Sequence, residues 1–359
     1  MKVNGIIVEY NPFHNGHIYQ INKVKEMYPN DLLIIILNGY FTQRGNISVL
    51  SKEDKTKLAL DYGVDLVVEL PCIYGIQSAD IFAYQSIKIL NELKIDRLIF
   101  GSESNNLDIL KKIASIQEDE YFNLKLKEEL DKGISYPNAL RNIIDINFDY
   151  QPNDLLGISY IKAINKINNN IEIISIKRTN DYHDKNSNNK IISAENIRNK
   201  YSNNIDIKTY TPAYKYIKPI DNELYFKLLK TKILTDSHLD EYVDVNEGIE
   251  NRLIKYINNS KNIIDFIEKI KTKRYSYNKI NRMLLHIVLG FKKDENISTL
   301  SVRILGFNNK GKEYLNKNKF KFEENKFIKN LEINYSKIYD LLTNSNTYEF
   351  ELKNIPVKK

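Results

Sequence analysis

The chain has a single cysteine among its 359 residues and no long apolar run, and each absence limits the class of protein that it can be. Because Cys72 is alone, no disulfide can form within the chain, which fits a reducing compartment. No apolar stretch approaches the roughly 18 residues that a membrane span needs, and no charged segment followed by an apolar one opens the sequence. We therefore expect a globular, cytoplasmic protein with no membrane partner.

Charge is distributed unevenly along the chain. The formal net charge is +7, with 42% hydrophobic and 28% charged residues, an ordinary balance for a folded protein. Residues 1–250 hold 30 Lys and Arg against 35 Asp and Glu, whereas residues 251–359 hold 23 against 11, a net charge of +12. A concentrated positive field favours a polyanion as partner, and the plainer alternative is a solvated basic surface without one.

The first 205 residues alternate short β-branched runs with amphipathic patterns, as a Rossmann-like parallel α/β sheet does. Ligands of such sheets bind at the carboxyl ends of the strands. Strands are predicted at Val3–Val8, Leu32–Leu37, Leu66–Glu69, Arg97–Phe100 and Ile171–Ile176. Helices are predicted at Gly16–Tyr28, Lys52–Tyr62, Ser78–Leu93 and Asp154–Ile167.

After about residue 205 the alternation fades and helical periodicity dominates. This change predicts two domains, residues 1–205 with the parallel sheet and residues 206–359, mostly helical and basic. Before this point, the polar segment Asn180–Asn189 is expected to be a mobile loop, and Ser193 to be the N-cap of a helix. Helices are expected at Leu224–Leu234, Gly248–Asn258, Ile263–Lys271 and Tyr277–Leu289, followed by a strand-like stretch, Ser301–Phe307, and a polar, Lys-rich tail.

The segment directly after the first predicted strand indicates the chemistry. His14-Asn15-Gly16-His17 follows the Asn11-Pro12 turn and leads into a predicted helix. The open amides at a helix N-terminus attract anions, Gly16 lets a phosphate approach the backbone, and two imidazoles can donate to oxygens that gain charge at an α-phosphorus. His14 and His17 are therefore the candidate catalytic residues of a site for a nucleoside triphosphate.

Two other interpretations of this segment are open. A His-x-Gly-His sequence can form a turn with surface histidines, although the strand before it and the amphipathic helix after it favour a nucleotide site. Two histidines three residues apart would need further ligands to hold a metal ion, and no cysteine or carboxylate cluster lies nearby in the sequence. We therefore predict no metal ion held by protein ligands.

Motifs spread over nearly the whole chain resemble those of bacterial tRNA(Met) cytidine acetate ligases, a family within the His-x-Gly-His nucleotidyltransferase superfamily. The blocks occur in the family's order, which makes this resemblance more specific than the His-x-Gly-His sequence alone. They are Glu9–His17, Asn38–Gly45, Asp65–Pro71, Gln77–Asp80, Phe100–Glu103, Ser193–Arg198, Glu247–Leu253, Lys273–Tyr275 and Arg303–Asn308.

The resemblance implies ATP-dependent acetylation of N4 of the wobble cytidine of elongator tRNA(Met), through an acetyl-adenylate made from free acetate. Mg²⁺ is expected with the ATP, and the basic C-terminal region is expected to bind the tRNA. The residues that the resemblance assigns to ATP binding are Ile7, Val8, Glu9, Tyr10, Asn11, Pro12, Phe13, His14, Asn15, Gly16, His17, Gln20, Gly101, Asn153 and Arg178.

Some of these residues have simpler roles open to them. Gly101 can permit a tight turn, Asn153 can cap a helix after Pro152, and Arg178 can be a solvated charge at a strand end. Glu195 departs from the family, in which a small or hydroxyl residue is usual beside the expected phosphate region.

Two other functions fit part of the sequence. A small-molecule adenylyltransferase uses the same phosphate loop but is usually more compact, and a catalytically silent RNA-binding protein would not need intact His14, Gly16 and His17. A class I aminoacyl-tRNA synthetase is disfavoured because no Lys-Met-Ser-Lys-Ser-like loop is present.

Overall fold

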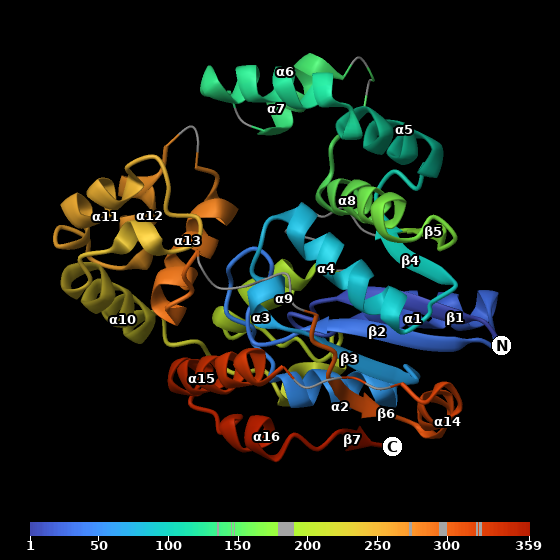
Figure 1. Ribbon diagram of the computed structural model, residues 1–359. Helices are drawn as coiled ribbons and strands as arrows, with labels where there is room; N and C mark the ends of the chain where they lie inside the picture. Colours follow the sequence, from blue (N-terminus) through green and yellow to red (C-terminus); the bar gives the residue numbers. More distant parts are fainter. Residues whose placement is uncertain are drawn as a thin grey trace.

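The fold is built around a seven-stranded sheet with the order β5-β4-β1-β2-β3-β6-β7 (Figure 1). The computed structural model describes residues 1–134, 136–144, 146, 148–178, 190–272, 275–293, 300–320, 322 and 325–359. The strands from β5 to β3 are parallel, β6 is antiparallel to β3, and β7 is parallel to β6. The strands are β1 (Val3–Val8), β2 (Leu32–Asn38), β3 (Leu66–Leu70), β4 (Arg97–Ser102), β5 (Glu172–Lys177), β6 (Ile304–Phe307) and β7 (Val357–Lys358). The five predicted parallel strands are thus confirmed.

The helices predicted from periodicity are also confirmed, with ends shifted by at most two residues. Ser193 is the N-cap of the helix that follows it, and its Oγ accepts a hydrogen bond from the N–H of Asn196 (3.2 Å). The confirmed helices are α1 (Asn15–Met27), α2 (Lys52–Asp61), α4 (Ala79–Glu92), α8 (Pro152–Ile167), α9 (Ala194–Ser202), α10 (Asn222–Thr235), α11 (Ile249–Ile257), α12 (Ile263–Ile270) and α13 (Tyr277–Leu289). Sequence reasoning left out α3 (Cys72–Gly75), α5 (Leu107–Glu118), α6 (Glu120–Asp131), α7 (Tyr136–Ile143) and the short turns η1 (Pro212–Lys215) and η2 (Leu239–Glu241).

The prediction of a polar tail at the end of the chain was wrong. Residues after β6 form α14 (Asn309–Asn318), α15 (Lys326–Thr343) and α16 (Tyr348–Lys353) before the chain ends in β7. On α15, Ile328, Tyr335, Tyr339 and Leu342 are buried at helical spacing, so one face of this Lys-rich helix belongs to the core.

Helices cover both faces of the sheet. The side chains of β2 show most clearly how successive residues alternate between the two faces. Its residues Leu32, Ile34 and Ile36 pack into the core that contains α4, α8 and α15. Leu33, Ile35 and Leu37 pack into a second core with α1 and α9. Successive side chains of a strand point to opposite faces, so a run of seven buried residues is what a central parallel strand requires.

The C-terminal half of the chain contributes to this same sheet. β6 pairs with β3, and β7 then pairs with β6, so residues 304–358 return to the sheet after the helices α10 to α13. The fold is α/β with a parallel-dominated sheet, as expected. The division into residues 1–205 and 206–359 stays a prediction, and the two strands show that the sheet is not made by residues 1–205 alone.

Helix α13 holds the C-terminal helices against the loops that follow β2 and β3. Gly45 in the first loop has a φ of +79°, and a Cβ at this position would lie 2.4 Å from the backbone nitrogen of Arg282. The buried ring of His286 lies with Nε2 2.8 Å from the carbonyl oxygen of Ile76 and Nδ1 3.1 Å from that of Val243. These contacts bring α13 to the edge where a parallel sheet binds its ligands.

A second set of charged groups lies inside the protein, between α2, β3, α15 and α16. The Nζ of Lys52 lies 2.9 Å from Oε2 of Glu332 and 2.9 Å from Oε1 of Glu351, and it also pairs with Glu69. Arg303 pairs with Glu351 and lies 3.6 Å from Oε2 of Glu69. We call these five residues the buried ion cluster, because its lysine and three carboxylate side chains are at most 2% exposed.

Among the described residues, we find no helix with the length and apolar character needed to cross a membrane.

Candidate active site

The loop between β1 and α1 places two histidines at the start of α1. His14 is the N-cap, with extended backbone angles of φ −148° and ψ 174°. Its Nδ1 accepts a hydrogen bond from the N–H of Gly16 (3.0 Å), and Nδ1 of His17 accepts one from the N–H of His14 (3.1 Å). This reciprocal capping box satisfies two amides that would otherwise be open at the start of the helix. It also orients both imidazoles through bonds made within four consecutive residues.

The capping box also determines which ring nitrogen carries the proton. A nitrogen that accepts a hydrogen bond is not protonated, so each neutral imidazole carries its proton on Nε2. Burial lowers the pKa of His14 to about 3, aided by the charges of Arg178 and Arg198. Burial, His14 and Arg178 hold the pKa of His17 well below its usual value. At neutral pH both rings are therefore uncharged hydrogen-bond donors through Nε2.

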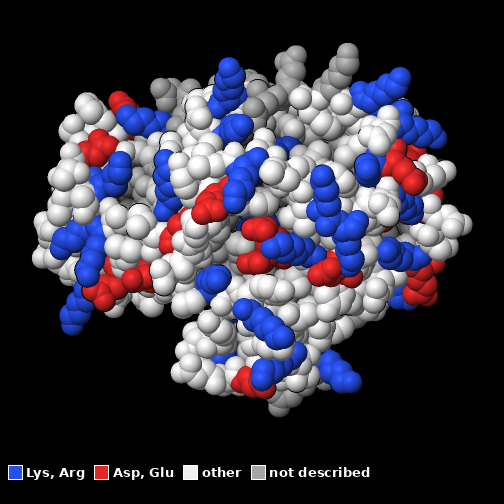
Figure 2. Space-filling model, turned by 90° about the horizontal axis from the view of Figure 1, so that it is seen from below, with Lys and Arg blue, Asp and Glu red and all other residues white. Residues whose placement is uncertain are grey.

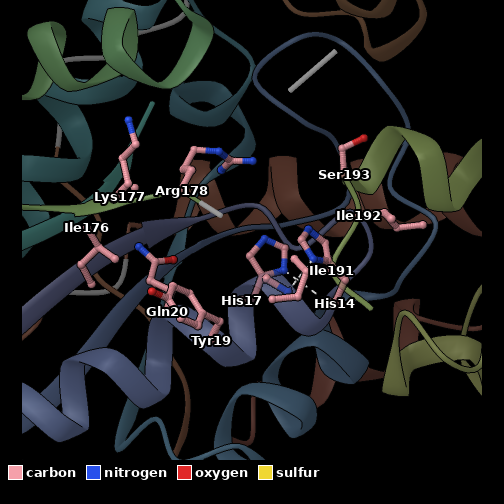
Figure 3. A pocket seen from close by; sticks show the side chains of 12 residues that line it. His14, His17, Tyr19, Gln20, Ile176, Lys177, Arg178, Ile191, Ile192 and Ser193 are labelled. Carbon is pink, nitrogen blue, oxygen red and sulfur yellow. Dashed lines mark hydrogen bonds between the residues drawn. The ribbon is translucent and has the colours of Figure 1, made fainter. Parts of the chain in front are cut away.

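Both imidazoles line a pocket that is partly open to solvent. In Figure 3 Arg178 extends from the end of β5 over the space beside the two rings. Its Nε is buried without a hydrogen-bond partner among the described residues, and Oε1 of Glu103 is 3.7 Å away. A buried guanidinium nitrogen without a partner is costly, so an anion is the ligand that fits here. The lining residues are His14, Gly16, His17, Tyr19, Gln20, Gly101, Ile176, Lys177, Arg178, Ile191, Ile192 and Ser193.

Two further arginines, Arg44 and Arg198, add positive charge to the same region. Arg198 on α9 donates from Nη1 to the backbone carbonyl of Asn11, in the loop before α1. Burial lowers the pKa of Arg178 and Arg198, and the charge of Arg44 lowers both further. Three guanidinium groups around two neutral imidazoles suit a polyphosphate. Sequence reasoning did not single out Arg44 or Arg198, although both belong to blocks of the family resemblance.

The structure brings only part of the expected ATP-binding set to this pocket. His14, Gly16, His17, Gln20, Gly101 and Arg178 line it, whereas Ile7, Val8, Glu9, Tyr10, Asn11, Pro12, Phe13, Asn15 and Asn153 do not. Tyr10 and Phe13 are buried and pack edge to face, with ring centroids 4.8 Å apart. The amide nitrogen of Asn15 donates to the carbonyls of Lys190 (2.8 Å) and Thr209 (2.9 Å). Tyr10, Phe13 and Asn15 therefore hold the loop in place rather than face the pocket.

Asn153 lies at the start of α8, and its side chain is engaged by Glu103. The N-cap of α8 is Gln151, so the simpler expectation that Asn153 caps this helix was wrong. Its side-chain amide donates to Oε1 of Glu103, while the backbone N–H groups of Asn153 (3.2 Å) and Asp154 (3.1 Å) donate to Oε2. Asn153 therefore connects the loop after β4 to α8, beside Arg178.

Gly16 and Gly101 both line the pocket, but a side chain would have a different effect at each position. A Cβ on Gly16 would lie 2.7 Å from Cε1 of His14, so any side chain would displace the ring that this residue's N–H orients. Gly101 lies within β4 and pairs with Ile176 on β5, so the simpler interpretation as a tight turn was wrong. A Cβ on Gly101 would make an ordinary contact of 3.4 Å with the side chain of Arg178.

The structure also bears on the expectations for Arg178, for a metal ion and for the polar segment Asn180–Asn189. Arg178 is not a solvated charge, because its side chain is 30% exposed and its Nε is buried. In the described part of the chain, no three His, Cys, Asp or Glu side chains gather in a way that could hold a metal ion. The polar segment Asn180–Asn189 lies outside the described residues.

A parallel sheet with a His-x-Gly-His capping box at its carboxyl edge places the protein in the class of His-x-Gly-His nucleotidyltransferases. A model of the HIGH Nucleotidyl Transferase family matches residues 1–355. The tRNA(Met) cytidine acetate ligase of Caldicellulosiruptor bescii is 40% identical, over 90% of this chain and 86% of the relative. That of Mycoplasmopsis pulmonis is 43% identical, over 80% of this chain and 98% of the relative. The chain belongs to the tRNA(Met) cytidine acetate ligase family, as the sequence blocks indicated.

A solved structure agrees with this assignment over the whole fold. The Thermotoga maritima TmcAL bound with alpha-thio ATP covers 100% of both chains, with a TM-score of 0.86 and 26% identity. The apo form of the same protein gives a TM-score of 0.85. The pocket beside His14 and His17 is thus found in a fold that binds an ATP analogue.

Proposed function

We propose that this protein activates acetate with ATP and transfers the acetyl group to N4 of the wobble cytidine of elongator tRNA(Met). The observation that carries this proposal is the pocket in which His14, His17 and Arg178 come together. Two neutral Nε2–H donors and a guanidinium with an unpartnered Nε form an anion site that is organised before any ligand binds. The family membership supplies the identity of the acyl donor and of the acceptor.

ATP supplies an adenylyl group for transfer and pyrophosphate as the leaving group. In the first step an acetate oxygen attacks the α-phosphorus, and charge grows on the phosphate oxygens. The Nε2–H groups of His14 and His17 are placed to donate to these oxygens, and Arg178 to neutralise them. In the second step the cytidine amine attacks the acetyl-adenylate and releases AMP.

We include Mg²⁺ in this proposal as the companion of the ATP phosphates. The donors at the pocket are imidazole and guanidinium groups, which suit phosphate oxygens rather than a hard cation. Mg²⁺ would therefore be held by the phosphates and water, with no protein carboxylate assigned to it.

For the tRNA, we propose the segment around the start of α13 as one contact surface. Lys271 lies 3.8 Å from the ring centroid of Tyr277, and Lys279 lies 4.1 Å from that of Tyr275. Paired cations and aromatic rings suit an unpaired nucleotide strand. Helical spacing on α13 would place Arg282 on the same surface as Lys279, but Arg282 is buried and donates from Nε to Asp244 at 3.2 Å. Lys273 and Arg274 lie outside the described residues.

The basic residues of the C-terminal region do not form a continuous positive surface on every face of the protein. On the face seen in Figure 2, which lies below α15 and α16 in Figure 1, Lys and Arg side chains are interspersed with Asp and Glu. This face therefore offers no continuous basic area to a polyanion, and the proposal places the tRNA contact elsewhere.

Incubation with ATP, labelled acetate and bulk tRNA, followed by mass analysis of the nucleosides, tests the function. Acetylated cytidine in the tRNA is the expected product, with AMP and pyrophosphate released. Adenylyl transfer to a small molecule, with no acetylated cytidine, would favour a small-molecule adenylyltransferase. RNA binding without ATP consumption would favour a catalytically silent RNA-binding protein.

A further inference from the structure

Glu9 is a carboxylate beside the phosphate site, where a negative charge needs a physical reason. It follows directly on the last residue of β1 and precedes the loop that carries His14 and His17. Its Oε1 accepts hydrogen bonds from the backbone N–H of Gln43 (2.6 Å) and from Nδ2 of Asn38 (3.0 Å). Its other oxygen, Oε2, accepts no hydrogen bond from the described residues, although the side chain is held in one place.

Glu9 interacts electrostatically with titratable groups on three different helices. Glu9 raises the pKa of Arg198 on α9, of Lys55 on α2 and of Tyr160 on α8, and burial is the largest influence on each of these groups. The Nζ of Lys55 is already engaged by the carbonyls of Asn38 (3.1 Å) and Gly39 (2.6 Å). Arg198 and Lys55 are thus the basic groups that interact with this carboxylate.

Phosphate binding does not explain this arrangement. A fixed carboxylate near Arg198 weakens the binding of a polyphosphate there, because the carboxylate and the phosphates carry charge of the same sign. Anchoring of the loop accounts for Oε1 but not for the free Oε2. A carboxylate oxygen is, however, the acceptor that suits the exocyclic N4 amine of cytosine. The amine is a poor nucleophile, because its lone pair is delocalised into the ring, and it gains from losing a proton as it attacks.

We propose that Glu9 binds the N4 amine of the acceptor cytidine through Oε2 and takes one proton from it during acetyl transfer. The proposal rests on the proposed function. The N4–C bond to the acetyl carbonyl forms as the bond between that carbonyl carbon and the AMP oxygen breaks. AMP leaves with the electron pair of that bond, and the amine proton passes to Oε2 and then to solvent. No oxidant or reductant takes part.

The variant Glu9→Gln separates the two roles of the side chain. Its carbonyl oxygen can still accept from Gln43 and Asn38, so the loop keeps its anchor, whereas the second position no longer carries a basic oxygen. Glu53→Gln, on the exposed side of α2, is the matched control for loss of one carboxylate. Each variant is assayed for acetate-dependent exchange of pyrophosphate into ATP and for acetyl transfer to tRNA, over a pH series.

We expect Glu9→Gln to lose about 100-fold or more of the transfer rate beyond any loss of the exchange rate, as for a lost general base. Wild-type transfer by Glu9→Gln would overturn the proposal, and so would a parallel loss of exchange and transfer, which would make Glu9 an anchor only. If the wild-type protein itself makes no acetylated cytidine, the proposed function fails instead.

Discussion

The pocket beside α1 and the buried ion cluster both gather charged side chains, but they differ in how those charges are satisfied. In the buried ion cluster, Lys52 has three carboxylate partners and is fully buried. In the pocket, Arg178 faces one carboxylate, with Oε1 of Glu103 3.7 Å from its Nε, but this Nε has no hydrogen-bond partner among the described residues, and the side chain remains 30% exposed. The first arrangement joins α15 and α16 to the sheet, and the second leaves binding capacity for an anion.

The comparison shows that the partners of a buried charge, rather than burial itself, distinguish a structural group from a functional one. Burial acts against the charged form of Lys52, yet its three glutamates hold its pKa well above the usual value. Burial lowers the pKa of Arg178, and the charge of Arg44 acts in the same direction. The phosphates of a bound nucleotide would reverse this effect at Arg178.

The largest expected effect on stability is that of Lys52→Met. This change leaves three buried carboxylates without their shared cation, and breaking a buried ion pair in this way costs about 3–5 kcal/mol. Urea unfolding at pH 7 measures the loss. The control is Lys57→Met, because Lys57 pairs with Glu53 at 2.6 Å on the surface and such pairs contribute only about 0.3–0.5 kcal/mol. Equal losses in the two variants would mean that the cluster does not hold α15 and α16 to the sheet.

In the pocket, His14→Ala and His17→Ala should act on turnover while the fold persists. Removing one preorganised donor to a developing oxyanion costs about 2.7–4 kcal/mol, or roughly 10²–10³ in rate. Acetate-dependent pyrophosphate exchange measures this loss. His238→Ala removes an exposed histidine and should keep the wild-type rate. A variant that keeps full exchange would remove its histidine from the mechanism.

The lowered pKa of His14 gives stability a pH dependence with a defined sign. The native pKa is about 3 and the value for an unperturbed histidine is 6.5, so below about pH 6.5 the unfolded chain binds a proton that the native protein does not. The contribution of the buried neutral His14 to the free energy of unfolding is therefore fully present above about pH 6.5 and is lost as the pH decreases from there toward 3. His14→Asn keeps an N-cap residue and should flatten this slope by up to about 1.4 kcal/mol per pH unit. Urea unfolding between pH 4 and 7 tests it, and an unchanged slope would show that His14 is protonated in the native protein.

The smallest expected effect concerns the proposed tRNA surface. Lys271→Gln with Lys279→Gln should lower the slope of log affinity against log salt by about 0.7 for each lost contact to a single strand, or about 0.9 in a duplex. Filter binding of tRNA over a salt series measures the slope. Lys111→Gln with Lys112→Gln removes the same charge from the exposed side of α5 and should leave the slope unchanged. Equal slopes in both double variants would place the RNA surface elsewhere, whereas pyrophosphate exchange should be unaffected in both.

The sequence by itself determined the features that depend on neighbours along the chain. The parallel strands, the Ser193 cap and the phosphate loop follow from local pattern, because strand burial and capping need only a few consecutive residues. The His14–His17 capping box is closed within four residues, so the sequence alone places both imidazoles at the start of a helix.

Tertiary structure decided the features that depend on partners far along the chain. Only the folded chain brings Arg198 near His14 and Arg44 near Arg178 and Arg198. Arg282 is buried because Asp244 pairs with it. In the tail, Glu332 is buried because Lys52, 280 residues away, and the backbone N–H of Cys72 both donate to its carboxylate. In the sequence, a charged side chain predicts a position on the surface. It is buried in the core only when folding brings a counter-charge to it, and no local pattern of residues contains that information.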